Sequence, residues 1–155
     1  IRDSPVSRGL GDVYKRQIEQ WHEVMKVGGK EGALKLDSLL HDDVIFYSPV
    51  VFTPQKGKKI TMLYLSAASG VFGDQKSTNN SEKKQSKFKY VNEIIEGNSA
   101  CLEFETEMNG LYVNGVDLIK WNEDNKITEF KVLIRPLQAV NHIHQMMGKM
   151  LDQLK

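Results

Sequence analysis

Two side chains of the 155-residue sequence have the type and setting for acid–base chemistry. Asp117 lies in residues 115–119 (GVDLI), a run that is otherwise apolar. Burial raises the pKa of a carboxyl group, so a carboxyl in such a run can exchange a proton near neutral pH. Histidine is the side chain type that ordinarily changes charge in that range, so His22 is the expected partner, unless it is a surface histidine. Asp117 is therefore expected either to act on a ligand or to be a structural hydrogen-bonding group.

The composition is that of one ordinary globular domain, because 40% of the residues are hydrophobic and 26% are charged. A net charge of +1 gives no basic surface for nucleic acid, and no apolar run approaches the roughly 20 residues that span a bilayer. Cys101 is the single cysteine, which argues against a disulfide and a thiolate metal cluster. We expect a cytoplasmic protein with no metal, no cofactor, and no nucleic-acid or membrane partner.

Residues 1–17 (IRDSPVSRGLGDVYKRQ) show neither helical nor strand periodicity. The string is similar to translated adaptor sequence at the ends of metagenomic reading frames. We expect this segment to be disordered and not native, with residues 18–155 forming one domain. A native disordered tail is the alternative.

Helical periodicity dominates the first half of the remaining chain and its end. The predicted helices cover about residues 18–27, 31–40, 58–72 and 136–154, and a short strand covers 44–48. Leu34, Leu137 and Met147 are expected to face the core. The almost wholly polar residues 73–87 predict a loop at the rim of any pocket.

Between these helices, residues 88–96, 99–108, 111–122 and 126–134 predict four antiparallel strands. Asn109-Gly110 is a strong hairpin signal, and a turn there places Leu102 opposite Asp117. Because side chains alternate along a strand, Asp117 then shares the apolar inner face. A competing turn at Asn114-Gly115 would change this. The face directed to water carries Glu103, Glu105 and Glu107.

The order of these elements resembles the nuclear transport factor 2-like superfamily, in its SnoaL-like and ketosteroid-isomerase-like branch. The resemblance covers about residues 18–136 and is carried by residues 40–49 (LHDDVIFYSP), Gly57, 115–119 and 126–130 (KITEF). It implies an α+β fold: a cone-shaped roll of a curved antiparallel sheet packed on N-terminal helices around an apolar pocket, here with an extra C-terminal helix. It also implies a homodimer.

In ketosteroid isomerases the position matching Asp117 is a protonated acid that donates a hydrogen bond to an oxyanion. The base of that family precedes the corner proline, where this chain has Ser48, which cannot act as a base near neutral pH. Epoxide hydrolases of the superfamily hold water with two carboxylates and an arginine, roles for which Glu93 and Arg135 are the candidates here.

These observations predict a small-molecule pocket protein, an isomerase, cyclase or hydrolase acting on an apolar substrate by acid–base chemistry. A non-catalytic binding or accessory module and a protein-interaction domain are the alternatives. Ser48 has a competing role in satisfying backbone groups at the corner. Asp117 and His22 are the expected catalytic residues, and the expected substrate-binding residues are Trp21, Ser48, Tyr64, Leu102, Phe104 and Phe130.

Overall fold

The described residues form four helices and one six-stranded sheet. The computed structural model describes residues 5–72 and 87–154. The elements are α1 (Pro5–Val27), α2 (Gly29–Leu39), β1 (Leu40–Tyr47), β2 (Gln55–Lys56), α3 (Lys58–Phe72), β3 (Lys89–Glu96), β4 (Ser99–Met108), β5 (Leu111–Trp121), β6 (Ile127–Arg135) and α4 (Leu137–Leu154). The predicted α+β fold is confirmed.

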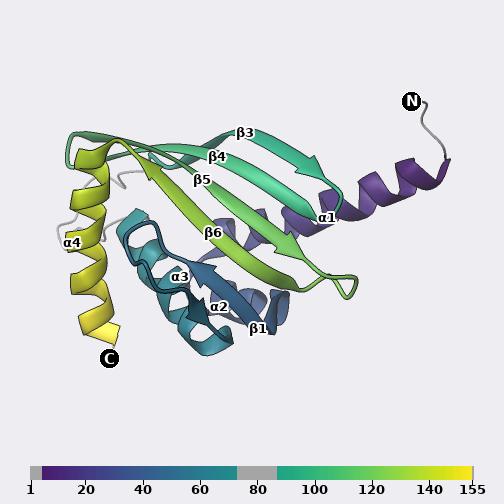
Figure 1. Ribbon diagram of the computed structural model, residues 1–155, viewed down its shortest axis with the longest axis horizontal. Helices are drawn as coiled ribbons and strands as arrows, with labels where there is room; N and C mark the ends of the chain where they lie inside the picture. Colours follow the sequence, from purple (N-terminus) through teal and green to yellow (C-terminus); the bar gives the residue numbers. More distant parts are fainter. Residues whose placement is uncertain (1–4, 73–86, 155) are drawn as a thin grey trace.

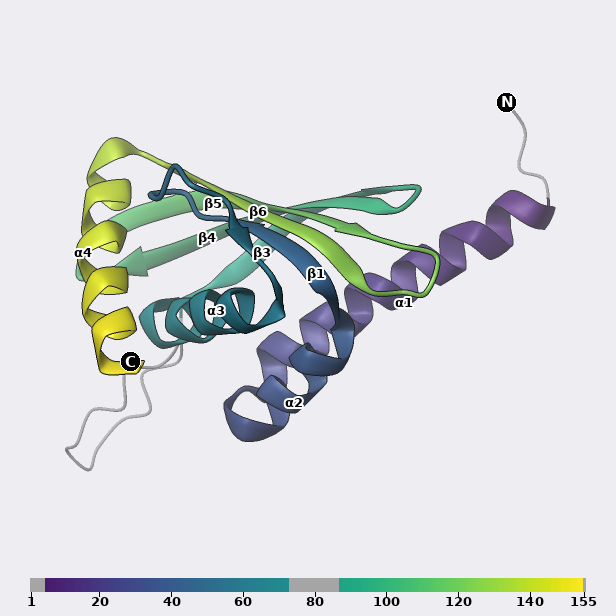
Figure 2. The ribbon, with the colours of Figure 1, turned by 60° about the horizontal axis from the view of Figure 1, so that its bottom comes forward.

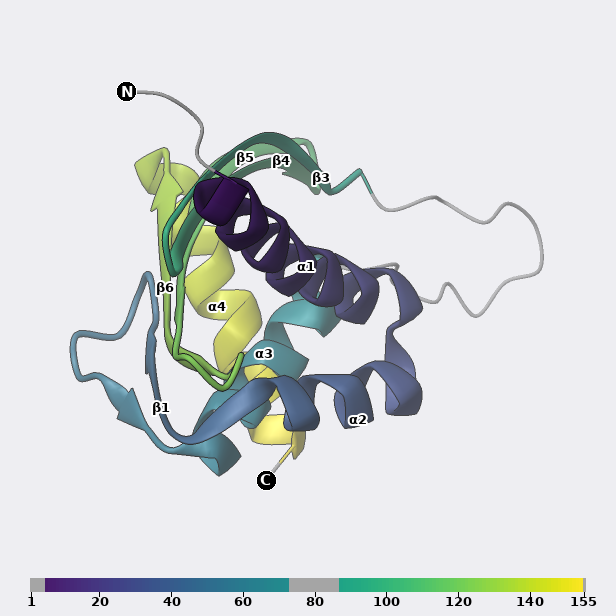
Figure 3. The same cartoon turned by 90° about the vertical axis from the view of Figure 1, so that its right-hand side faces the viewer.

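The sheet has the order β2-β1-β6-β5-β4-β3 and is strongly curved (Figures 1 and 3). Strands β3 to β6 form the predicted antiparallel meander. Strand β1 pairs in parallel with β6, so the sheet is mixed rather than wholly antiparallel. The long connection between β1 and β6 permits this parallel pairing, which a hairpin could not provide.

The predicted register between β4 and β5 is confirmed. The chain turns at Asn109-Gly110, where both residues have positive φ, and Leu102 pairs with Asp117. Side chains of alternate residues are buried, and Asp117 is only 6% exposed. The inner face of these two strands carries Leu102, Phe104, Thr106, Val113, Gly115, Asp117 and Ile119.

Helices α1, α3 and α4 cover the concave side of the sheet, and α4 stands at one end of the cone beside α3 (Figures 1 and 2). Along α4 the buried residues are Ala139, Ile143 and Met147, spaced four residues apart as one helical face requires. These side chains pack in a common cluster with Phe104 of the sheet. None of the helices in the described part is long and apolar enough to cross a membrane.

Three local predictions are wrong. Leu34 is 74% exposed and Leu137 is 72% exposed, because Leu36 and Ala139 occupy the faces of α2 and α4 that meet the core. Strand β1 begins at Leu40, not at residue 44, because Leu40 already pairs with Ile127 of β6; a register shift separates this pair from those that begin at Ile45.

Helix α1 extends toward the N-terminus over residues 5–17, which we expected to be disordered. Residues 1–4 lie outside the described part of the chain. Whether residues 1–17 belong to the native protein stays a prediction. The polar segment expected at the pocket rim falls almost wholly on residues 73–86, which also lie outside the described part.

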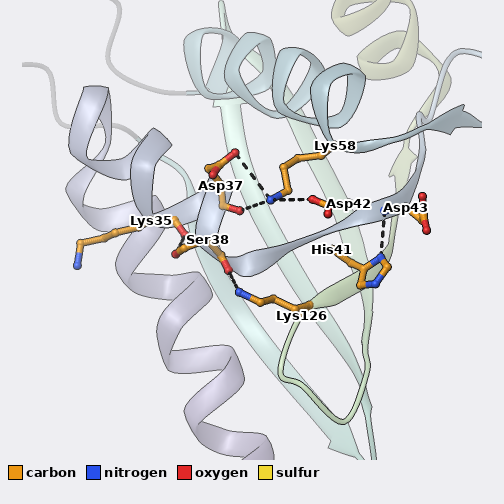
Figure 4. Close-up of polar contacts among 8 residues, drawn as sticks. All are labelled: Lys35, Asp37, Ser38, His41, Asp42, Asp43, Lys58 and Lys126. Atoms are coloured by element: carbon orange, nitrogen blue, oxygen red, sulfur yellow. Dashed lines mark hydrogen bonds and ion pairs between the residues drawn. The ribbon is translucent and has the colours of Figure 1, made fainter.

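A polar cluster ties α2, β1 and α3 together (Figure 4). The Lys58 ammonium donates to the backbone carbonyl of Asp37 at 2.9 Å and lies 3.4 Å from Oδ1 of Asp42. Lys126, in the turn before β6, donates to the carbonyl of Ser38. Carbonyls at the end of a helix have no partner within it, so the two lysines satisfy carbonyls that the end of α2 leaves open.

Candidate functional site

An apolar cavity lies inside the cone, between the sheet and helices α1, α3 and α4. Its volume is about 70 Å³. Aromatic and aliphatic side chains from the sheet and helices form most of its wall, and Asp117 is the only acidic residue among the described lining residues. The described lining residues are Trp21, Met25, Phe46, Ser48, Pro49, Val50, Tyr64, Leu65, Ala68, Ser69, Phe72, Phe88, Phe104, Asp117, Phe130, Val132, Ile134, Ile143 and Met147.

Asp117 belongs to a chain of hydrogen bonds that runs from α1 to β5. The indole Nε1 of Trp21 donates to the Tyr90 hydroxyl oxygen at 3.0 Å, and the Tyr90 hydroxyl donates to Oδ2 of Asp117 at 2.6 Å. Indole can only donate and a hydroxyl carries one proton, so the direction of the chain is fixed. Oδ2 is therefore held as an acceptor, and Oδ1 is left for a ligand or a proton.

Burial sets the protonation states of Asp117 and Tyr90. It raises the pKa of the Asp117 carboxyl from its ordinary value to about 7, and the hydrogen bond from Tyr90 opposes part of that rise. Burial, followed by the charge of Asp117, raises the pKa of Tyr90 well above 10.0, so its hydroxyl keeps its proton. Asp117 thus exchanges a proton near neutral pH while Tyr90 remains a donor.

Five of the predicted substrate-binding residues line the cavity: Trp21, Ser48, Tyr64, Phe104 and Phe130. Trp21 packs on Phe130 with ring centroids 4.9 Å apart, and Tyr64 packs on Phe46 at 5.3 Å. Leu102 is completely buried but is not among the lining residues, because it packs in the core cluster beside the cavity.

His22 also lies outside the cavity lining and does not contact Asp117. Its Nε2 pairs with Oε1 of Glu93 on β3, and both side chains are about one-third exposed. The imidazole ring meets the edge of the Tyr90 ring, with centroids 5.1 Å apart. The structure thus places His22 beside the hydrogen-bonded chain, as a link between α1 and β3.

Neither Glu93 nor Arg135 contributes to the cavity wall. Glu93 is paired with His22, and Arg135 donates to Oδ1 of Asn114 at 3.3 Å on the outer side of the sheet. Among the described residues, no group of three His, Cys, Asp or Glu is placed to hold a metal ion. The described lining of this cavity therefore holds neither the second carboxylate nor the arginine of the water-activating arrangement of epoxide hydrolases.

Ser48 has its hydroxyl oxygen committed to the backbone. It accepts from the amide of Val50 at 3.2 Å and from the amide of Val51 at 3.3 Å. This is the usual local bonding of a serine that stabilises a turn, here the corner after β1. The hydroxyl proton is not used in these two bonds.

Tyr90 is the residue that the sequence did not reveal. Counting back from the turn at Gly97-Asn98, unbroken pairing would set Tyr90 opposite Glu105, on the outer face. A bulge between Tyr90 and Asn92 shifts the register, and Tyr90 instead pairs with Phe104 on the inner face. A bulge inserts one residue and reverses the faces beyond it, so simple alternation misplaces this tyrosine.

A curved sheet wrapped around an apolar cavity, with helices closing its open side, defines a class of cone-shaped α+β pocket proteins. Comparison with models of known protein families finds no match, and comparison with curated protein sequences finds none either. Solved structures do match, over most of the chain.

The similar structures include a steroid delta-isomerase from Pseudomonas aeruginosa, 24% identical, with a TM-score of 0.76, covering 91% of this chain and 93% of that one. An uncharacterised protein with a cystatin-like fold from Silicibacter pomeroyi DSS-3 is 28% identical, with a TM-score of 0.70, over 86% and 83% of the two chains. An NTF2-like protein of unknown function from Mesorhizobium loti is 16% identical, with a TM-score of 0.61, over 79% and 93%. The chain has the nuclear transport factor 2-like fold, as the resemblance in sequence implied.

Proposed function

We propose that the protein binds a neutral apolar small molecule in the cavity, with a carbonyl or hydroxyl group against Asp117, and that Asp117 transfers a proton to or from it. One observation carries the proposal: among the described residues that line an apolar cavity, the only acid is a buried carboxyl with a pKa near neutrality. Such a carboxyl is proton acceptor and proton donor in turn at the pH of the cell.

The hydrogen-bond chain supports a defined geometry for that transfer. Tyr90 holds Oδ2 of Asp117 and is itself held by Trp21 of α1, so we expect a ligand to approach Oδ1. Because no second base is found among the described lining residues, a single carboxyl would have to both remove and return the proton. Shifts of a double bond next to a carbonyl need only these two steps, and the similar steroid delta-isomerase is a precedent within this fold.

A non-catalytic binding module is the second candidate, and Ser48 favours it. The position that supplies the base in ketosteroid isomerases holds a hydroxyl that is engaged with the backbone of Val50 and Val51. In this alternative Asp117 only orients a ligand by hydrogen bonding.

Asp117→Asn separates these two candidates. The variant keeps the size of the side chain and its contact with Tyr90 but cannot exchange a proton. We would offer wild type and variant a panel of β,γ-unsaturated ketones, following formation of the conjugated enone by absorbance, and measure binding of the same compounds by calorimetry. Glu96→Gln, which changes an exposed carboxyl on β3, is the matched control.

Catalysis predicts that wild type and Glu96→Gln turn over a ketone that Asp117→Asn binds but converts about 10²–10⁴-fold more slowly. Binding without turnover by wild type would support the non-catalytic module. Equal turnover by Asp117→Asn would show that Asp117 is not the acid–base group, and absence of binding by all three proteins would refute the pocket function.

We also propose a homodimer formed through the outer face of the sheet. Leu118 of β5 and Leu133 of β6 are 36% and 48% exposed on that face. Sedimentation equilibrium tests the proposal, and Leu133→Glu should shift a dimer toward monomer. A wild-type monomer at all concentrations would contradict it.

A further inference from the structure

The cavity around Asp117 is too small for a ligand of ordinary size. Its volume of about 70 Å³ is well below the roughly 300–1,000 Å³ of typical small-molecule pockets. A larger ligand anchored at Asp117 must therefore extend beyond this cavity.

A groove adjoins the cavity at the side of α1 and α3. Four residues line both spaces: Trp21, Met25, Leu65 and Ser69. Trp21 and Leu65 are buried, whereas Met25 is 39% exposed, so the junction lies where the cavity approaches the surface. Methionine is unbranched and flexible, and it adapts its shape to neighbouring apolar groups.

Beyond this junction the groove follows the turn between α1 and α2 and the facing side of α3, helices that lie close together in Figure 3. Its volume is about 190 Å³, more than that of the cavity itself. The small residues Gly28, Gly29, Gly32 and Ala33 form one wall, and Ser66 stands on the α3 side. Gly28 and Gly29 have positive φ, and no atom lies within 4 Å of where their side chains would begin. This open space is available to a ligand.

The described lining of the groove is electrically neutral. Among the described residues none that lines it is charged, and Ser66 and Ser69 supply its hydroxyl groups. Its chemistry suits a neutral hydrocarbon chain and disfavours a charged or strongly hydrogen-bonding one.

We propose that the groove lined by Met25, Ala33 and Ser66 is a second subsite, which receives the alkyl tail of an elongated ligand whose polar end meets Asp117. This inference rests on the proposed binding function of the cavity and adds the class of ligand. Small compact ligands would occupy the cavity alone, and a tail passes Met25 and Ser69 on its way into the groove.

A homologous series of alkan-2-ones, from pentan-2-one to undecan-2-one, tests the subsite by calorimetry. Each buried methylene strengthens binding about fourfold, so affinity for wild type should keep rising with chain length. In Ser66→Trp the indole fills the groove, and the rise should end at a shorter chain. Ala33→Phe fills it from the opposite wall and should do the same. Lys59→Trp places an indole on an exposed position of α3 that lines neither space, and its profile should match wild type.

If wild type, Ser66→Trp and Ala33→Phe gave the same profile, the groove would not hold the tail, although binding of the short ketones would still uphold the cavity function. A wild-type profile that stops rising at the shortest chains would likewise overturn the subsite. If no ketone bound to wild type at any length, both the subsite and the proposed function would fall.

Discussion

The Tyr90 hydroxyl lies 2.6 Å from Oδ2 of Asp117 and donates to it, although strand β4 separates the strands that carry the two residues. The curvature of the sheet brings the two side chains together across the concave face. Trp21 completes the arrangement from α1, so three elements distant in the sequence fix one carboxyl. Four predictions follow from this site and its scaffold.

Tyr90→Phe should raise the pKa of Asp117 further above its present value of about 7, because the hydrogen bond from Tyr90 favours the ionised carboxyl. Carbon-13 NMR titration of the aspartate carboxyls measures it. The change should also reduce the free energy of unfolding by about 1–3 kcal/mol, since the buried Trp21 N–H loses its acceptor.

Tyr112→Phe is the matched control for this change. Tyr112 donates to Oε1 of Glu105 at 2.9 Å, a tyrosine–carboxylate pair on the outer, exposed face of the sheet. It should leave the titration of Asp117 unchanged. A fall in the Asp117 pKa in Tyr90→Phe would contradict the donor role assigned to Tyr90.

Stability should depend on pH through Asp117. Its pKa is raised from an ordinary 3.8 to about 7 by folding, so the folded state holds a proton that the unfolded state releases. The resulting stabilisation is complete below the ordinary pKa and is lost as pH rises through about 7. Between about pH 5 and pH 8 we expect a loss of about 2–3 kcal/mol from this group.

Urea unfolding of wild type and Asp117→Asn at both pH values measures that loss. The variant lacks the titrating group, so its unfolding free energy should not show this loss. The difference between variant and wild type should therefore shift by about 2–3 kcal/mol in favour of the variant as pH rises from about 5 to about 8. Glu96→Gln corrects for the change in net charge. A constant difference between wild type and Asp117→Asn across this range would show that Asp117 titrates normally.

The His22–Glu93 pair should be a weak link between α1 and β3. Both side chains are partly exposed, so a double-mutant cycle of His22→Asn and Glu93→Gln should give a coupling of about 0.2–1 kcal/mol. Neither change should move the Asp117 pKa by much, because His22 does not contact that carboxyl. A large shift in the carboxyl titration of His22→Asn would restore His22 as its acid–base partner.

Gly115→Ala should disrupt the cavity wall. A Cβ at this position would lie 2.5 Å from the carbonyl oxygen of Leu133 and 2.5 Å from Cζ of Phe104. Since the carbonyl belongs to the neighbouring strand, the sheet must move, and we expect a loss of about 1–3 kcal/mol in thermal or urea unfolding.

Gly148→Ala provides the comparison. Gly148 is an exposed position of α4 with open space around it, and alanine favours a helix over glycine by about 1 kcal/mol. This variant should be as stable as wild type or more so. Equal stability of the two variants would mean that the Phe104 ring and the strand backbone relax without cost.

The sequence alone determined the meander and the direction of Asp117. Asn109-Gly110 selects a tight turn, and the period of two then assigns each side chain of β4 and β5 to one face. These are local effects, since they depend on the turn residues and on alternation within neighbouring strands. The nuclear transport factor 2-like fold was likewise evident from the order of the elements.

Tertiary structure decided which groups surround Asp117. The bulge beside Tyr90 reverses the face of that residue, and no local pattern marks it. Helix periodicity gives an apolar stripe but not the rotation of the helix against the sheet, so His22 meets Glu93 while Trp21 reaches Tyr90. Burial depends on the whole packed cone, and it alone converts an ordinary aspartate into a carboxyl with a pKa of about 7.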